Sequence, residues 1–208
     1  MKTSDLAKQL IIEIEQIYPE AQTELLNWTT AFQFLVCIAL SAQTTDKQVN
    51  KVTEGLFKKY PTAKKLMGAK DEDVEHTLQG INYFKTKAKH IIEMAKIVND
   101  QYQGEPPKTL IELQTLPGVG YKTANVFLND LYHSNQGIAV DTHVSRVAKS
   151  YGLTKETDPT QIAHDLEKLY PKDDWYKVNS LFVLYGRYIL KAKKPDWEKV
   201  VLKEYLVI

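Results

Sequence analysis

The chain has 208 residues, of which 43% are hydrophobic and 25% charged, so it can bury a sizeable core, and no apolar run in it has the length that spans a bilayer. Its net charge of +1 neither favours nor excludes a polyanionic partner, because a balanced total can combine a basic face with an acidic one. The single cysteine, Cys37, excludes an internal disulfide and any site built from several cysteines, and its apolar surroundings predict a buried thiol.

Apolar residues recur at helical spacing along nearly the whole chain. In chain order they mark one face in each of three segments: Leu6, Leu10, Ile11, Ile14 and Ile17; Val49, Val52, Leu56 and Phe57; and Ile91, Ile92, Ala95 and Val98. Residues 31–41 are apolar on all sides, which predicts a central helix buried by its neighbours. Later helices are predicted over 109–115, 121–133, 142–151, 160–169, 174–192 and 196–205. Only residues 137–140 look strand-like, so the sequence predicts an all-α fold.

The segment LPGVG, residues 116–120, connects two of these predicted helices. Its glycines can take positive φ at little steric cost, and they leave backbone N–H groups uncovered at the start of the next helix. Because the positive end of the helix dipole lies behind those groups, the turn is suited to bind a phosphate-sized anion. The alternative is a simple helix–helix turn, and in either case Val119 is expected to anchor the loop in the core.

Two side chains near this turn can carry chemistry. Lys122 lies in the first turn of the predicted helix, where the helix dipole disfavours an ammonium ion, and an uncharged amine is a nucleophile that can form a Schiff base. Asp141 follows the apolar run at 137–140 and precedes another predicted helix, which indicates a helix N-cap. The alternatives are an ordinary surface lysine and a carboxylate that faces a cleft, and Asp141 can serve as both cap and cleft carboxylate.

Four segments together resemble the helix–hairpin–helix DNA glycosylase superfamily, and specifically its endonuclease III group. They are residues 39–51, 116–129, 138–147 and 184–195, in the same order as in that group. The resemblance implies one glycosylase fold over residues 1–208, with a helix–hairpin–helix motif at about 109–133. It also implies two helical lobes with a DNA-binding cleft between them. Lobe A is expected over about 22–132, and lobe B over about 1–21 plus 133–208.

The resemblance further implies that Lys122 is the nucleophile and Asp141 the essential aspartate. Such an enzyme flips the damaged nucleotide out of the duplex. Lys122 would attack C1′ of the sugar, and Asp141 would stabilise the positive charge that grows there. The implied activity is a bifunctional base-excision-repair glycosylase and abasic-site lyase that removes oxidised pyrimidines such as thymine glycol. A glycosylase with another lesion preference and a non-catalytic DNA-structure binding protein are the alternatives.

Contacts to DNA are implied at several further positions. Backbone amides near Gly118 and Gly120 would hold a phosphate, in a loop that also contains Leu116 and Val119, and Lys193 is a further candidate phosphate contact.

A wedge that fills the space left by the flipped nucleotide is also implied. Gln43 matches the polar wedge of the family, and Tyr83 stands where the family usually has leucine, preceded by Asn82 instead of glycine. Tyr83 is expected either to stack on bases or to pack into the core. The lysines that follow it, Lys85, Lys87 and Lys89, could meet phosphates or form a solvated helix face.

The largest departure from the family lies near the C-terminus. Many members carry four cysteines that bind a [4Fe–4S] cluster, and the alignment places Leu190, Trp197, Val200 and Leu206 at those positions. Because such a cluster requires thiolates, we expect no cluster and no other cofactor or metal. An apolar plug is expected instead, with Trp197 filling most of its volume.

These expectations define the partners. We expect the protein to bind damaged double-stranded DNA, to avoid membranes, and to act as a monomer, because one active cleft suffices. The N-terminal sequence lacks a signal-peptide core, which favours a cytoplasmic location, associated with the nucleoid if the protein is bacterial.

Overall fold

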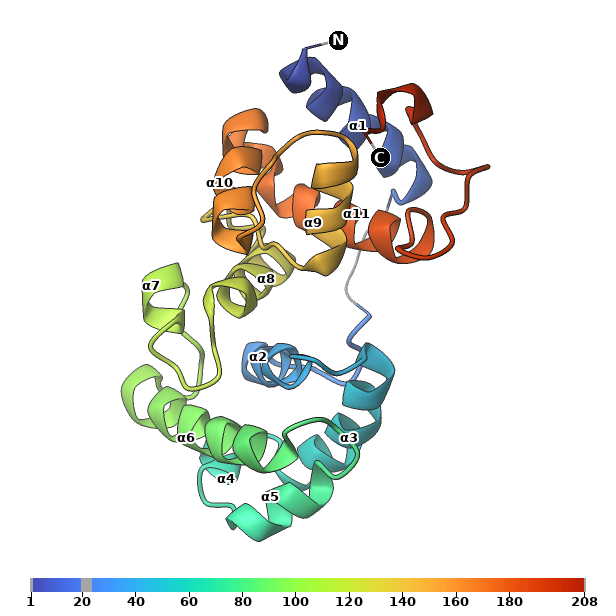
Figure 1. The fold of residues 1–208 in the computed structure, drawn as a ribbon. Helices are drawn as coiled ribbons and strands as arrows, with labels where there is room; N and C mark the ends of the chain where they lie inside the picture. Colours follow the sequence, from blue (N-terminus) through green and yellow to red (C-terminus); the bar gives the residue numbers. More distant parts are fainter. Residues whose placement is uncertain (1, 20–23, 208) are drawn as a thin grey trace. The chain divides into compact units, whose positions relative to one another are not determined.

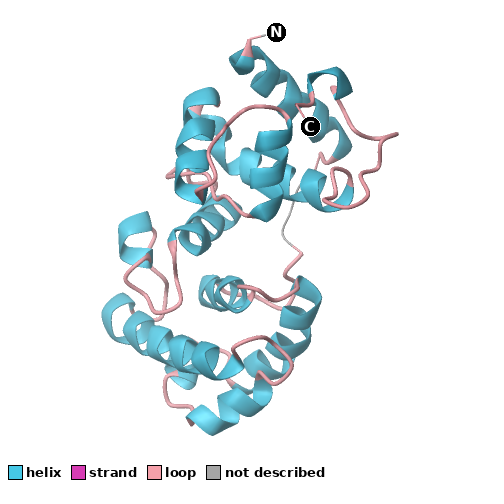
Figure 2. Ribbon diagram, in the orientation of Figure 1, coloured by secondary structure: helices cyan, strands magenta, loops and turns pink. Residues whose placement is uncertain are grey.

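The structure, a computed structural model, describes residues 2–19 and 24–207, and the described residues form helices and loops without a strand (Figure 2). The α-helices in chain order are α1 (Thr3–Ile17), α2 (Ala31–Leu40), α3 (Asp46–Lys59), α4 (Ala63–Leu66), α5 (Asp71–Thr77), α6 (Phe84–Tyr102), α7 (Leu110–Leu113), α8 (Tyr121–Tyr132), α9 (Thr142–Ser150), α10 (Pro159–Leu169) and α11 (Trp175–Tyr188) (Figure 1). Short 3-10 turns lie at Lys172–Asp174 and Lys203–Tyr205. The all-α prediction is confirmed.

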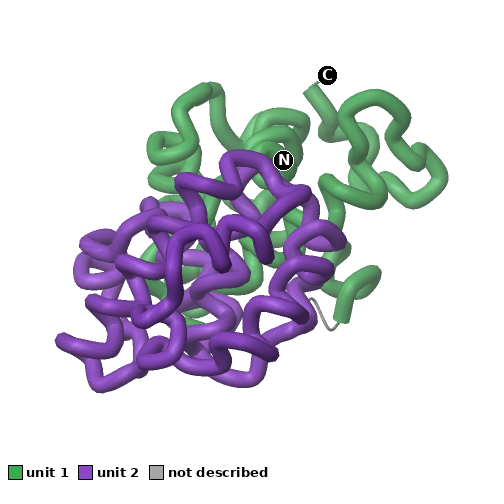
Figure 3. The backbone as a smooth tube through the Cα atoms, turned by 90° about the horizontal axis from the view of Figure 1, so that it is seen from below, with its two compact units in different colours: residues 1–22, 132–208 green, residues 23–131 purple. Residues whose placement is uncertain are grey.

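The chain divides into two compact units (Figure 3). Unit 1 consists of Met1–Gln22 and Tyr132–Ile208, and unit 2 of Thr23–Leu131. Helices α2 to α7 and nearly all of α8 belong to unit 2, whereas α1 and α9 to α11 belong to unit 1. Within the described ranges, no helix combines the length and the apolar content that crossing a membrane requires.

Helix α2 is the centre of unit 2. Residues 32–40 are all buried, as expected for a helix without a polar face, and Thr30 caps its start by accepting a hydrogen bond from the backbone of Gln33. Cys37 lies in this helix with its side chain fully buried, and burial raises the pKa of its thiol to about 12. The prediction of a buried thiol is therefore confirmed.

Unit 1 joins the two ends of the chain. The Nζ atom of Lys177 in α11 donates to Oε1 of Glu15 in α1 at 2.8 Å, and α1 also packs on α11 through the apolar face predicted from its spacing. The last residue of that predicted face, Ile17, is 37% exposed, so the buried part of the face ends one turn earlier, at Ile14. Helix α11 also packs closely on α9, where a Cβ atom added to Gly186 would lie 3.0 Å from the backbone oxygen of His143.

The C-terminal tail differs from the prediction in two respects. No α-helix forms over 196–205, and Trp197 is 51% exposed, so it does not fill an apolar plug. Leu190 and Val200 are buried instead, and Leu206 is half-buried. The cause is a chain reversal after α11, in which the backbone N–H of Asp196 donates to the carbonyl of Ile189 at 2.8 Å.

Two tyrosines hold this tail through the peptide groups of Val201. The backbone N–H of Val201 donates to Oη of Tyr185 at 3.0 Å, and Oη of Tyr151 donates to the Val201 carbonyl at 2.6 Å. The two hydroxyl oxygens are 2.8 Å apart, and because the Tyr151 proton goes to Val201, Tyr185 must donate to Tyr151. The ring of three hydrogen bonds therefore satisfies both hydroxyls and both backbone groups.

We expect Tyr185→Phe to destabilise unit 1 by about 1–3 kcal/mol, because the substitution leaves the part-buried N–H of Val201 without its acceptor. Urea unfolding followed by circular dichroism measures the change. Tyr102→Phe, in unit 2, is the control. A Tyr185→Phe protein as stable as the control would contradict a stabilising role for the hydrogen-bonded ring.

Candidate active site

The helix–hairpin–helix predicted at about 109–133 consists of α7, the turn at 116–120 and α8. Leu116 and Val119 are buried at 2% and 5% exposure, and the N–H of Val119 donates to the carbonyl of Leu116 at 3.1 Å. Val119 thus anchors the turn in the core of unit 2. Any contact of these two residues with a phosphate can come only from the backbone, because their side chains point into the protein.

The two exposed glycines of this turn have different structural requirements. Gly118 has φ +77°, and a Cβ atom there would lie 3.4 Å from the side chain of His90, so both conformation and space favour glycine. Gly120 does not have a positive φ, and an added Cβ would meet nothing within 4 Å. The fold therefore does not require glycine at position 120, whereas a ligand that approaches the backbone closely would.

We expect Gly120→Ala to fold normally and to weaken binding of duplex DNA about tenfold, the equivalent of about 1.4 kcal/mol, because the methyl group covers the backbone at the start of α8. Fluorescence anisotropy with a labelled duplex measures the affinity. Gly68→Ala, an exposed turn position with comparable space, is the control. Equal affinity of Gly120→Ala and wild type would exclude a close approach of DNA at this turn.

Lys122 is the second residue of α8, and its side chain is exposed. The first turn of a helix directs its backbone N–H groups outward along the axis. The candidate amine therefore extends from the same helix end as the candidate phosphate site.

Asp141 is the N-cap of α9, as the sequence predicts. Its Oδ1 atom accepts hydrogen bonds from the backbone N–H groups of His143 at 2.8 Å and Val144 at 2.9 Å. The residue is half-buried. One carboxylate oxygen thus fixes the orientation of the whole group through the helix end.

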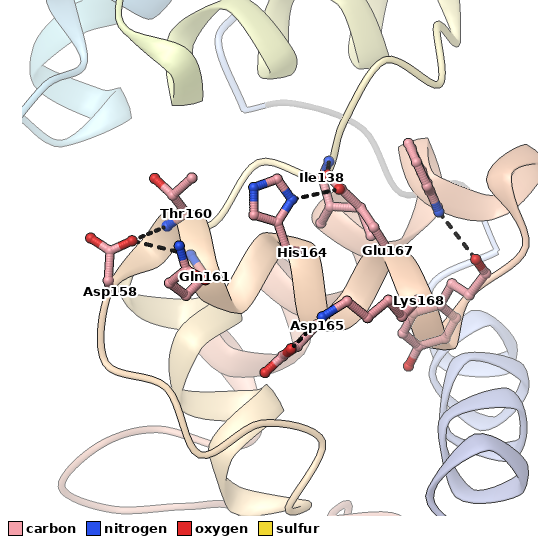
Figure 4. Close-up of polar contacts among 10 residues, drawn as sticks. Ile138, Asp158, Thr160, Gln161, His164, Asp165, Glu167 and Lys168 are labelled. Atoms are coloured by element: carbon pink, nitrogen blue, oxygen red, sulfur yellow. Dashed lines mark hydrogen bonds and ion pairs between the residues drawn. The ribbon is translucent and has the colours of Figure 1, made fainter.

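The run that leads to Asp141, residues 137–140, is buried but does not form the predicted strand. Its backbone bonds to side chains instead: the N–H of Ile138 donates to Oε1 of Glu167 at 3.1 Å, and Nδ2 of Asn179 donates to the carbonyl of Ala139 at 2.7 Å. Figure 4 shows Glu167 of α10 reaching Ile138, with His164 on its other oxygen. Asp141 is therefore held by the run before it and by the helix after it.

Arg146 is a residue of this region that sequence reasoning missed. Its Nε donates to the carbonyl of Leu190 at 2.8 Å, and its Nη2 donates to the carbonyl of Gly186 and lies 3.1 Å from Nδ1 of His143. Since a guanidinium only donates, Nδ1 of His143 accepts and the imidazole proton is on Nε2. No acidic residue lies three or four positions away from Arg146, a signal that its carbonyl partners, Gly186 and Leu190, are distant in sequence.

Burial lowers the pKa of His143 below its usual value, and the charge of Arg146 acts in the same direction while Asp141 opposes both. The imidazole is therefore neutral at pH 7. Arg146 links α9, the helix that Asp141 caps, to the end of α11 and to the chain reversal beyond it.

Both candidate wedge residues are exposed in unit 2. Gln43 lies in the loop between α2 and α3, and Tyr83, which precedes α6, is 66% exposed, which excludes the alternative that Tyr83 packs into the core. Lys85 and Lys89 are exposed, but Lys87 is only 8% exposed, and both readings of it as a surface lysine are wrong. Lys193 is exposed in the loop after α11.

The residues present do not fit the iron–sulfur cluster that the family resemblance raised. Leu190, Trp197, Val200 and Leu206 have no thiolate, and Cys37 lies in α2 of the other unit. Within residues 2–19 and 24–207, no three His, Cys, Asp or Glu side chains gather where they could hold a metal ion.

Residues 36–172 match the family described as "HhH-GPD superfamily base excision DNA repair protein". The chain is 40% identical to an endonuclease III of Synechocystis sp. over 189 residues, 91% of this chain and 86% of that protein. It is 37% identical to an endonuclease III of Bacillus subtilis over 184 residues, 88% of this chain and 83% of that protein. The chain belongs to the endonuclease III group of the HhH-GPD superfamily.

Among solved structures of this group, the chain is similar to a trapped covalent intermediate of endonuclease III with DNA. The TM-score is 0.93 at 34% identity, and the match covers 100% of this chain and 97% of that one. The recognition of the group from four sequence segments is confirmed.

Proposed function

We propose that this protein is a bifunctional DNA glycosylase and abasic-site lyase that removes oxidised pyrimidines from duplex DNA through a Schiff base on Lys122. The full-length similarity to an endonuclease III trapped covalently on DNA carries the proposal. The exposed position of Lys122 in the first turn of α8, beside the glycine turn, supports its assignment as the nucleophile.

The reaction begins when the neutral amine of Lys122 attacks C1′ of the extruded nucleotide and the damaged base leaves with the bonding electrons. The C1′–O4′ bond of the sugar then breaks as O4′ takes a proton, and the bond between C1′ and Nζ of Lys122 becomes a protonated imine. Loss of a C2′ proton expels the 3′ phosphate by β-elimination, and water hydrolyses the imine to regenerate the lysine. The carboxylate of Asp141 stabilises the positive charge on the sugar and takes up the proton of the lysine.

The other contacts position the duplex. Backbone N–H groups near Gly118 and Gly120 bind a phosphate at the start of α8, while Lys193 binds another. Gln43 and Tyr83 enter the space left by the extruded nucleotide. Base stacking on an aromatic ring contributes roughly 1–3 kcal/mol, which offsets part of the few kcal/mol that unstacking costs.

The remaining parts of the proposal concern the whole protein. The proposed lobes are about 22–132 and about 1–21 plus 133–208. No iron–sulfur cluster or other cofactor takes part, because the cluster positions lack thiolates. The protein acts as a monomer in the cytoplasm on damaged double-stranded DNA.

Borohydride trapping tests this function. The protein is incubated with a duplex that contains thymine glycol, and borohydride is added to reduce the imine. We expect a nicked strand without the reductant and a covalent protein–DNA adduct with it. Neither product on any of a panel of oxidised pyrimidines would contradict the proposal.

The same panel separates a second candidate, a glycosylase of this group with another lesion preference. Tyr83 and Asn82 stand where the family usually has leucine and glycine, at a position where substrate contacts are expected. Trapping on a different damaged base, with none on thymine glycol, would favour this candidate.

A further inference from the structure

Three exposed residues of unit 2, Gln43, Tyr83 and Gln103, have a positive backbone φ, which residues other than glycine rarely adopt, and the first two are the candidate wedge residues. Gln43 has φ +53° in the loop between α2 and α3, and Tyr83 has φ +56° directly before α6. A residue other than glycine keeps this left-handed conformation where the surrounding structure holds it. The side chains of Lys87 and Asn82 bind the loop at Gln43. The backbone N–H of Lys87 donates to the carbonyl of Tyr83 at 3.0 Å.

Lys87 reaches from the first turn of α6 into the end of α2. Its Nζ atom donates to the carbonyl of Leu40 at 2.9 Å, to the carbonyl of Ala42 at 2.7 Å and to Oγ1 of Thr44 at 2.8 Å. An ammonium group has three N–H donors and no acceptor, so these three contacts occupy all of its donors. Two of the three acceptors belong to the residues on either side of Gln43.

Asn82 binds Gln43 itself, because its Nδ2 atom donates to the Gln43 carbonyl at 2.7 Å. Unlike Lys87, Asn82 is exposed, and its hydrogen bond is on the surface beside the two candidate wedge residues. The loop at 42–44 and the segment at 82–87 are thus joined by the Lys87 and Asn82 bonds on both sides of Tyr83.

We propose that Lys87 and Asn82 are positioning residues that hold Gln43 and Tyr83 as one rigid wedge for the DNA duplex. This inference rests on the proposed function, since it assumes that both side chains enter the stack beside an extruded nucleotide. Because the wedge is arranged before DNA binds, little loop ordering accompanies nucleotide extrusion. The loop and the turn then enter the duplex together.

The test separates extrusion from chemistry. Asn82→Gly and Lys87→Met are compared with wild type on two substrates: thymine glycol in a duplex, and an abasic site in a single-stranded oligonucleotide, which has no stack to open. Lys96→Met, an exposed lysine further along α6, is the control. Fluorescence of 2-aminopurine next to the lesion follows extrusion directly.

For Asn82→Gly we expect extrusion and duplex excision to slow roughly five- to tenfold, the effect of about one hydrogen bond, while trapping on the single strand stays within about twofold. Lys87→Met is expected to have a larger effect in the same direction, and Lys96→Met none. Should Lys87→Met fail to fold, Asn82→Gly decides alone.

A double-substitution cycle shows whether Asn82 acts through the wedge. In a Gln43→Ala background, Asn82→Gly is expected to have little further effect, because the side chain that it positions is already gone. Additive losses, or equal losses on duplex and single strand, would overturn the inference. A wild-type protein that traps no substrate would instead overturn the proposed function, so the two failures are distinguishable.

Discussion

Lys122→Ala is expected to abolish the borohydride adduct and to lower strand cleavage at a damaged base by about 10³-fold or more, because no other group replaces the nucleophile. The substitution removes an exposed side chain, so the free energy of unfolding should stay within about 0.5 kcal/mol of wild type. Gel analysis of the trapped complex and single-turnover cleavage rates provide the two measurements.

Lys58→Ala, at an exposed position near the end of α3, is the matched control for loss of one positive charge in unit 2, and it should trap like wild type. An adduct that persists in Lys122→Ala would mean that another amine is the nucleophile. A loss of adduct in both variants would indicate weaker DNA binding instead of lost chemistry.

The sequence predicts burial well for a helix whose own residues are compatible with only one arrangement. Helix α2 is apolar on all sides, and no arrangement other than full burial accommodates it. The tail shows the opposite case, since Trp197 and Val201 have helical spacing without forming a helix. A helix would need the N–H and C=O of Val201 for its own bonds, and Tyr185 and Tyr151 bind both groups instead. Contacts so distant in sequence leave no periodic signal.

The same distinction applies to the candidate site. The cap at Asp141 is predictable because its two donors follow within three residues. The role of Lys87 is not, because its acceptors lie 43 to 47 residues earlier in the chain. A usable signal did exist: Lys87 lies on the apolar stripe of α6 that continues through Ile91 and Met94, whereas Lys85 and Lys89 lie off it.

Asp141→Asn should separate the two roles assigned to Asp141. Asparagine caps a helix about as well as aspartate, so the bonds from His143 and Val144 persist and the free energy of unfolding changes by less than about 1 kcal/mol. Loss of the negative charge removes the stabilisation of the developing positive sugar, and the single-turnover excision rate should fall roughly 10²–10³-fold. Asp141→Ala should lose the same activity and about 1 kcal/mol of stability as well.

The chain contains a matched control for this substitution. Asp158 caps α10 through the same pattern, with Oδ1 accepting from the backbone of Thr160 at 2.9 Å and of Gln161 at 3.1 Å (Figure 4). Asp158→Asn therefore makes the same chemical change at an equivalent helix end that is not part of the candidate site. Thermal unfolding should not distinguish the two variants, whereas excision should fall only in Asp141→Asn. If Asp141→Asn keeps full activity, its carboxylate is a helix cap alone and the charge on the sugar is stabilised by another group.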